Sequence, residues 1–260
     1  MLLRSVMRHF RNQEWTAIAL DFAVVVIGIL IAFQITTWNE QRQQHAREQQ
    51  YLGRIAAELD NTILEIEDAI SLTNERQALG EYLLRTVTDP ELVSADPATF
   101  FGALIFSGYT FSPRIRSYAF DEMQSAGELN ILRDRALRYD LTEFYTRVRG
   151  NAQWGYLREL GQTEYMKRSA GILTYEQQHA IAVARLESVA PESLPGLDVD
   201  AAIAAHDRMV ARPDFIEWLP IVTMRLHELE TYSTWLAEAH ALRGRIDVGA
   251  TMAPATEPAP

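Results

Sequence analysis

Residues that could bind a metal ion are few and scattered along the chain. Glu176 and His179 form one Glu-x-x-His pair, a spacing that places two ligands on one face of a helix. A di-iron centre in a helical bundle needs two such pairs and further glutamates on facing helices, and this sequence has only one pair. His206, His227 and His240 lie on different turns without matching acids. We therefore predict a solvated helix face at the pair and no metal site.

Nucleophilic and phosphate-binding chemistry is not indicated either. The chain of 260 residues has no cysteine, which excludes disulfides and thiolate nucleophiles. It contains no G-x-S-x-G, no S-x-x-K and neither of the glycine-rich phosphate loops. The acid pairs Asp121/Glu122 and Glu228/Glu230 are what an acidic helical surface supplies, and carboxylates are informative only when they converge in a cleft. We predict that the protein is not an enzyme and that it binds no cofactor.

One acid differs from the others because of its apolar surroundings. Asp21 lies in the segment 16–38, TAIALDFAVVVIGILIAFQITTW. An ionisable residue inside a membrane helix is a functional-site hypothesis by default. At about 100° per residue, Gly28 and Ala32 fall within roughly 40° of Asp21, and this small-xxx-small pair allows close approach by another helix. The alternative, that Asp21 reaches the headgroup region and is hydrated there, stays open.

The segment 16–38 predicts a transmembrane helix. Every residue from Phe22 to Phe33 is apolar or glycine. A helix from Thr16 to Thr37 covers roughly 33 Å, against a hydrocarbon core of roughly 30 Å. Trp15 and Trp38 stand at its ends, where interfacial tryptophans are favoured. A cleaved signal peptide would need a small-x-small site after the apolar run, and a core helix is rarely apolar around its whole circumference.

Charges beside this segment predict its orientation. The positive-inside rule places residues 1–15 in the cytoplasm and the large domain in the periplasm, so that the chain is a single-pass protein of a bacterial inner membrane. The net charge of −11 argues against nucleic-acid partners. Three arginines precede the segment, whereas two arginines mixed with glutamates follow it: Arg4, Arg8 and Arg11, then Arg42 and Arg47.

The rest of the chain predicts an all-α soluble domain over residues 39–246 and a disordered Ala/Pro-rich tail over 247–260. Apolar residues recur at spacings of three and four in a stretch without proline, which predicts one amphipathic helix continuous with the membrane segment. A helix packed on its own domain is favoured over a coiled coil, because the stripe covers under three heptads. The stripe consists of Leu52, Ile55, Leu59, Ile63, Ile66 and Ile70.

Prolines, glycines and capping residues divide the remainder into further helices. Gly127 is expected to supply a left-handed turn beside which Leu129 packs, with a binding loop as the alternative. A last long helix is expected over 213–245, with Pro220 as a kink inside it. The other helices are expected over 97–108, 117–126, 131–169, 174–189 and 198–211, with Asp96, Thr174 and Asp198 or Asp200 as N-caps and a loop at 191–196.

Two segments together resemble a known family. Val26 to Glu40 contains GILIAxQxxxWNE, and Tyr118 to Tyr145 surrounds the sequence SAGEL. They resemble an uncharacterised bacterial family of single-pass membrane proteins, grouped as a domain of unknown function, over about the first 150 residues. This chain has Thr36-Thr37 where the family more often has Asn-Asn. The resemblance implies a membrane anchor in a bacterial envelope and implies no activity.

Three functions follow as hypotheses. The leading one is a non-enzymatic envelope protein whose helical domain binds or scaffolds another protein, with self-association or a membrane partner at the face formed by Asp21, Gly28 and Ala32. The second is a periplasmic ligand-sensing domain that signals through its membrane helix to a partner, because about 15 cytoplasmic residues are too few for an output domain. The third is a hydrolase, which would need acids and histidines converging in a cleft.

Overall fold

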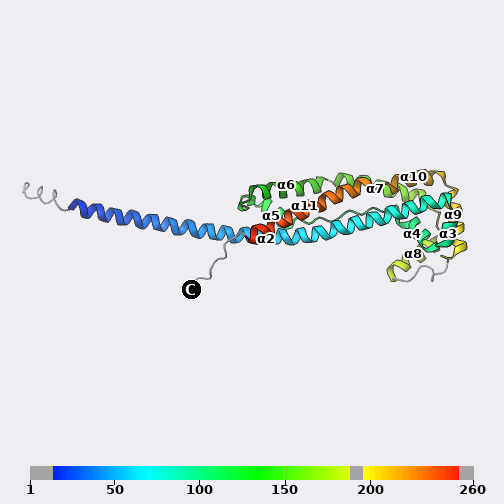
Figure 1. Cartoon of the computed structure of the whole chain (residues 1–260), viewed down its shortest axis with the longest axis horizontal. Helices are drawn as coiled ribbons and strands as arrows, with labels where there is room; N and C mark the ends of the chain where they lie inside the picture. Colours follow the sequence, from blue (N-terminus) through cyan, green and yellow to red (C-terminus); the bar gives the residue numbers. More distant parts are fainter. Residues whose placement is uncertain (1–13, 151, 188–195, 252–260) are drawn as a thin grey trace, which may run out of the picture.

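The computed structural model describes residues 14–150, 152–187 and 196–251, and every regular element within those ranges is helical. Its dominant feature is α2, Glu14–Thr88, a helix of 75 residues that runs from the apolar segment into the domain without a break (Figure 1). No proline lies within α2, and Asp89-Pro90 follows its end. The predicted all-α fold and the predicted continuity of this helix are confirmed.

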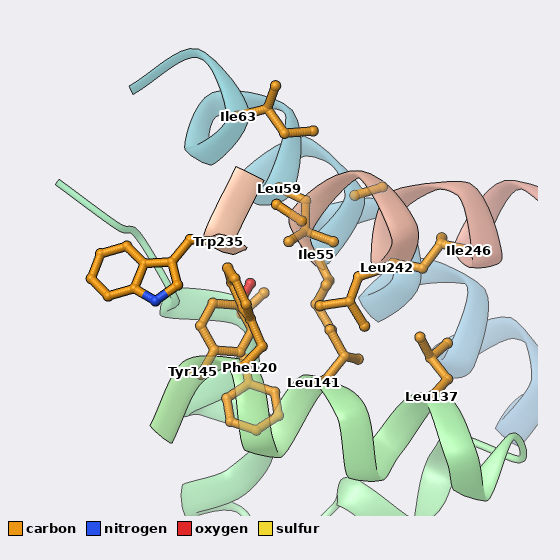
Figure 2. Close-up of a cluster of buried hydrophobic side chains, with 14 of the residues drawn as sticks. Ile55, Leu59, Ile63, Phe120, Leu137, Leu141, Tyr145, Trp235, Leu242 and Ile246 are labelled. Carbon is orange, nitrogen blue, oxygen red and sulfur yellow. The ribbon is translucent and has the colours of Figure 1, made fainter. Parts of the chain in front are cut away.

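The part of α2 nearest the apolar segment packs in what we term the proximal core. Here α2 meets α5 (Tyr118–Ser125), α6 (Arg135–Gly150) and α11 (Leu226–Thr251), which runs back along it. Figure 2 shows side chains from α2, α6 and α11 turned toward one another, with Ile55, Leu141 and Leu242 in the middle. The predicted apolar stripe is therefore the buried face of α2: Leu52, Ile55, Leu59, Ile63 and Ile66 are buried, and Ile70 packs at the edge.

The far end of α2 packs in a second cluster, the distal core. Leu83 of α2 is fully buried there beside Phe100, Tyr165 and Phe215. The distal core collects the short helices that lie at the opposite end of the domain from the apolar segment (Figure 1). They are α3 (Glu91–Ala95), α4 (Pro97–Phe106), the end of α7 (Ala152–Ser169), α8 (Tyr175–Glu187), α9 (Val199–Val210) and α10 (Pro213–Thr223).

Side-chain caps fix where several of these helices begin. The Asp96 carboxylate accepts from the backbone N–H of Thr99 at 3.0 Å, and Asp198 accepts from Ala201 at 2.8 Å. Thr174 Oγ1 accepts from the Gln177 N–H at 3.3 Å. Each of these oxygens satisfies a backbone donor that the first helical turn leaves unpaired, which confirms the predicted caps.

The prediction of one kinked helix over 213–245 is wrong, because the chain forms two helices there. Pro220 lies inside α10, but α10 ends at Thr223, where Met224 adopts an extended conformation (ψ 101°). Arg225 follows and is buried. Its Nη2 donates to the Ser107 carbonyl at 2.8 Å, and this hydrogen bond to another segment stabilises the break between the two helices. A proline that removes one helical hydrogen bond is thus followed by a full break.

Two other boundaries differ from the sequence-based expectation. α11 continues to Thr251 and so includes residues 247–251, which were expected in the tail; the remainder of the tail lies outside the described residues. The stretch 131–169 holds the end of a short 3-10 turn, η1 (Leu129–Ile131), followed by α6 and α7. The loop expected at 191–196 lies almost wholly outside the described residues.

Candidate functional site

The first third of α2 exposes apolar side chains on all sides. Among the described side chains from Leu20 to Trp38, every large apolar one except Val26 is more than half exposed, although buried apolar side chains are the rule elsewhere in the domain. A continuous apolar surface of this size needs a lipid or protein environment. The helix is long and apolar enough to cross a membrane. The exposed side chains are Leu20, Phe22, Val24, Val25, Ile27, Ile29, Leu30, Ile31, Phe33, Ile35 and Trp38.

The expected packing face on this helix is open. A Cβ atom added at Gly28 would meet no atom within 4 Å, and Ala32 is exposed one turn further on. Trp38, the expected interfacial anchor nearest the domain, is exposed. Asp21 and Trp15 both belong to α2, but their side chains lie outside the described part of the chain. Another helix could therefore approach the Gly28 side without displacing any described group.

A buried carboxylate fastens α2 to the domain at the point where the domain begins. Glu48 accepts from the Arg133 backbone N–H at 2.7 Å, and Arg133 Nε lies 3.4 Å from its other oxygen. His45 Nδ1 lies 3.4 Å from that same oxygen, one turn nearer the apolar segment. Because Glu48 is buried, these are short-range, weakly screened interactions. They hold the chain after η1 against α2.

The glycine corner lies just before this attachment. Gly127 has φ +69°, the left-handed conformation that ends α5, and Leu129 packs against the proximal core. Glu128 accepts from the Tyr51 hydroxyl of α2 at 3.1 Å. The two residues after Gly127, Glu128 and Leu129, thus have hydrogen-bonding or packing partners in the fold, which favours a structural corner over a binding loop.

The expected absence of a metal site stays a prediction. Glu176 and His179 are both exposed on α8, and in the described ranges no three His, Asp or Glu side chains are placed to hold a metal ion. His206 is buried instead, with Nε2 2.9 Å from the Thr86 carbonyl, so it ties α9 to the last turn of α2. His227 and His240 are exposed on α11.

The first acid pair singled out in the sequence, Asp121/Glu122, is engaged in ion pairs between helices. Glu122 accepts from Arg54 of α2 at 2.5 Å, and this hydrogen bond lowers the pKa of the Glu122 carboxyl. Its neighbour Asp121 pairs with Arg149 near the end of α6. The two acids therefore fasten α5 between α2 and α6. Of the second acid pair, Glu228 lies 3.4 Å from Arg225 and Glu230 is exposed.

Two residues that the sequence analysis did not single out carry the attachment of α2. Glu48 continues the apolar stripe at the same spacing, four residues before Leu52, and an acid in the register of a buried face is a signal that could have found it. Glu58 accepts from the Ala119 N–H at 2.8 Å and so caps α5 from another helix. No local pattern indicates that contact.

Comparison with known proteins gives one match. A family model described as a family of unknown function (DUF6090) matches residues 21–163, which is more than half of the chain. The matched range begins inside the apolar segment and ends in α7, so it includes the exposed apolar helix and the helices of the proximal core up to α7. No curated protein and no solved structure matches the chain.

Proposed function

The chain belongs to DUF6090, a family of unknown function, and we propose that it is a membrane-anchored protein that binds another protein and catalyses no reaction. In this proposal α2 crosses a bacterial inner membrane once and holds the helical domain in the periplasm. The observation that carries it is the continuity of α2, which joins the exposed apolar segment to both cores with no intervening loop.

The stretch of α2 between the apolar segment and the proximal core supports a spacer role. From Asn39 to Gln44 its side chains are exposed, and the domain begins at the buried Glu48. Ten residues of helix correspond to about 15 Å. A helical spacer would hold the domain at one height above the headgroups, which suits presentation to a partner at a fixed distance from the bilayer.

Single cysteines test the anchor and its orientation, since the natural chain has none. We expect Ser94→Cys in the domain to react with a membrane-impermeant maleimide in intact spheroplasts, and Ser5→Cys to react only after lysis. The chain should remain in the membrane fraction after carbonate washing. Labelling with the opposite pattern would reverse the orientation, and recovery of the chain in the soluble fraction would overturn the anchor.

The partner face is tested by crosslinking in intact cells followed by mass spectrometry. Gly28→Leu fills the open face, so it should reduce crosslinking to a second membrane helix, from another protein or another copy of this chain. Ala23→Leu is the matched control, because at about 100° per residue Ala23 lies roughly 140° around the helix from Gly28. Equal crosslinking in both variants and the natural chain would overturn this face.

A further inference from the structure

A groove opens in the distal core, between helices that the proposed function does not use. It has a volume of about 580 Å³ and lies between the end of α4, the end of α7 and the first turns of α8. Its floor is formed by buried apolar side chains, among them Leu104, Ile172 and Ile181. This volume is within the roughly 300–1,000 Å³ typical of small-molecule sites.

The chemistry of the lining restricts what the groove accepts. None of its lining residues is Asp, Glu, Lys, Arg or His, although these types are common in the chain. Two of its polar groups already have partners: the Tyr165 hydroxyl donates to the Leu104 carbonyl at 2.8 Å, and Gln178 Nε2 donates to the Leu173 carbonyl at 3.2 Å. A charged group placed inside would lose its hydration without gaining a counter-charge, which is costly.

We propose that this groove binds an uncharged, largely hydrocarbon small molecule, of the size of one lipid chain. Apolar burial would supply the affinity, and the exposed Met166 at the rim offers a flexible, polarisable contact that adapts to ligand shape. An anionic amphiphile such as a fatty acid is disfavoured, because the lining offers its carboxylate no cation and the chain carries a net charge of −11.

The groove is too far from the bilayer to take a lipid that stays in the membrane. Leu83 of α2 packs in the same core as the groove floor, and roughly 65 Å of helix separates it from Trp38. Figure 1 shows α4 and α8 at the end of the domain opposite the apolar segment. The ligand therefore arrives as a dissolved or carried molecule in the compartment of the domain.

Photolabelling of the full-length chain in detergent micelles tests this inference. The probes are a long-chain alcohol and a fatty acid of equal length, each carrying a diazirine at the same carbon, and labelled peptides are identified by mass spectrometry. We expect the alcohol to label residues 165–182 at least ten times more than the acid does. Both probes should label the apolar segment equally, which controls for probe delivery.

Variants of the rim separate the groove from general apolar labelling. Ala182→Trp, at an exposed rim position of α8, should reduce alcohol labelling of residues 165–182 at least fivefold. Ala204→Trp, at an exposed position of α9 outside the groove, should leave it unchanged. Labelling no higher than that of exposed α9, equal labelling by the two probes, or no effect of Ala182→Trp would each overturn the proposal. None of these outcomes bears on the partner face at Gly28.

Discussion

At the residue scale, one close fit in the distal core is between a glycine and a tyrosine distant in sequence. Gly108 lies against the fully buried ring of Tyr165, and a Cβ atom added there would come within 2.1 Å of a ring carbon. The Tyr165 hydroxyl also bonds to Ser107 at 2.9 Å. Gly108 is expected from sequence only as a helix end, because the ring that requires it comes from another helix.

Substitution of this glycine should be destabilising. Gly108→Ala forces the fully buried Tyr165 ring to shift from its packed position, so we expect the free energy of unfolding to fall by about 2 kcal/mol. Gly53→Ala is the matched control, because Gly53 lies inside α2 with nothing within 4 Å, and alanine there should raise stability by about 0.5 kcal/mol. Urea denaturation followed by circular dichroism measures both; equal effects would contradict the packing described.

A cap at α6 predicts a dependence on pH. Asp134 accepts from the Leu137 and Ala136 N–H groups at 3.0 and 2.8 Å, and the bond from Leu137 is the main cause that lowers the pKa of its carboxyl. Asp134→Ala should cost about 1 kcal/mol at pH 7. Because the folded-state pKa is lowered, the stabilisation is present above the ordinary aspartate value of about 3.9 and is lost as pH falls through the folded-state pKa.

The difference between Asp134→Ala and the natural chain should therefore shrink on acidification to pH 2, as measured by thermal unfolding. Asp134→Asn keeps a capping oxygen, so it should retain most of the stability at pH 7. A gap between Asp134→Ala and the natural chain that stays constant from pH 7 to pH 2 would show that the negative charge of Asp134 does not contribute to stability.

At the scale of elements, the sequence predicts helices and their buried faces best where apolar residues recur at regular spacing. The buried stripe of α2 and the caps of α4, α8 and α9 follow from spacing and capping residues alone. The break between α10 and α11 cannot be predicted from spacing and capping residues, because it depends on the hydrogen bond from Arg225 to Ser107, which joins distant segments. Ion pairs such as Arg54–Glu122 and the cap from Glu58 are equally non-local.

Substitution of two leucines on α2 tests which face of the helix contributes to the stability of the fold. Leu59 is fully buried in the proximal core, so Leu59→Ala should lower the free energy of unfolding by about 3 kcal/mol. Leu64 is 59% exposed on the same helix, so Leu64→Ala should change it by less than about 0.5 kcal/mol. Chemical denaturation of the full-length chain measures both. Similar losses would mean that the outer face of α2 is also covered.

At the scale of the whole molecule, two cores share one helix. The proximal core and the distal core lie in succession along α2, and α11 returns over much of that length (Figure 1). The sequence indicates the apolar segment long enough to cross a membrane, the continuous helix and the all-α class, since these depend on composition and periodicity. It does not indicate the groove, because α4, α7 and α8 meet there only through tertiary packing.

Spin labels can test whether α2 is one rigid rod. Labels on Thr37→Cys and Ala57→Cys, both exposed, should give one narrow distance distribution near 30 Å in lipid nanodiscs. Replacing residues 41–44 by four glycines should broaden it, because glycines in series behave as a flexible linker, whereas four alanines should keep it narrow. A broad distribution in the unaltered chain would show that the spacer already bends.

With α2 crossing the bilayer as proposed, its length beyond Trp38 converts a small tilt of the membrane segment into a large movement of the domain. About 75 Å of helix separates Trp38 from Thr88, so a change of about 10° in the angle at which the anchor crosses the lipid sweeps the far end through about 13 Å. Single helices tilt over wider ranges than this. Bilayer thickness, or contact at the Gly28 face, would thus decide which volume of the compartment the distal core can reach.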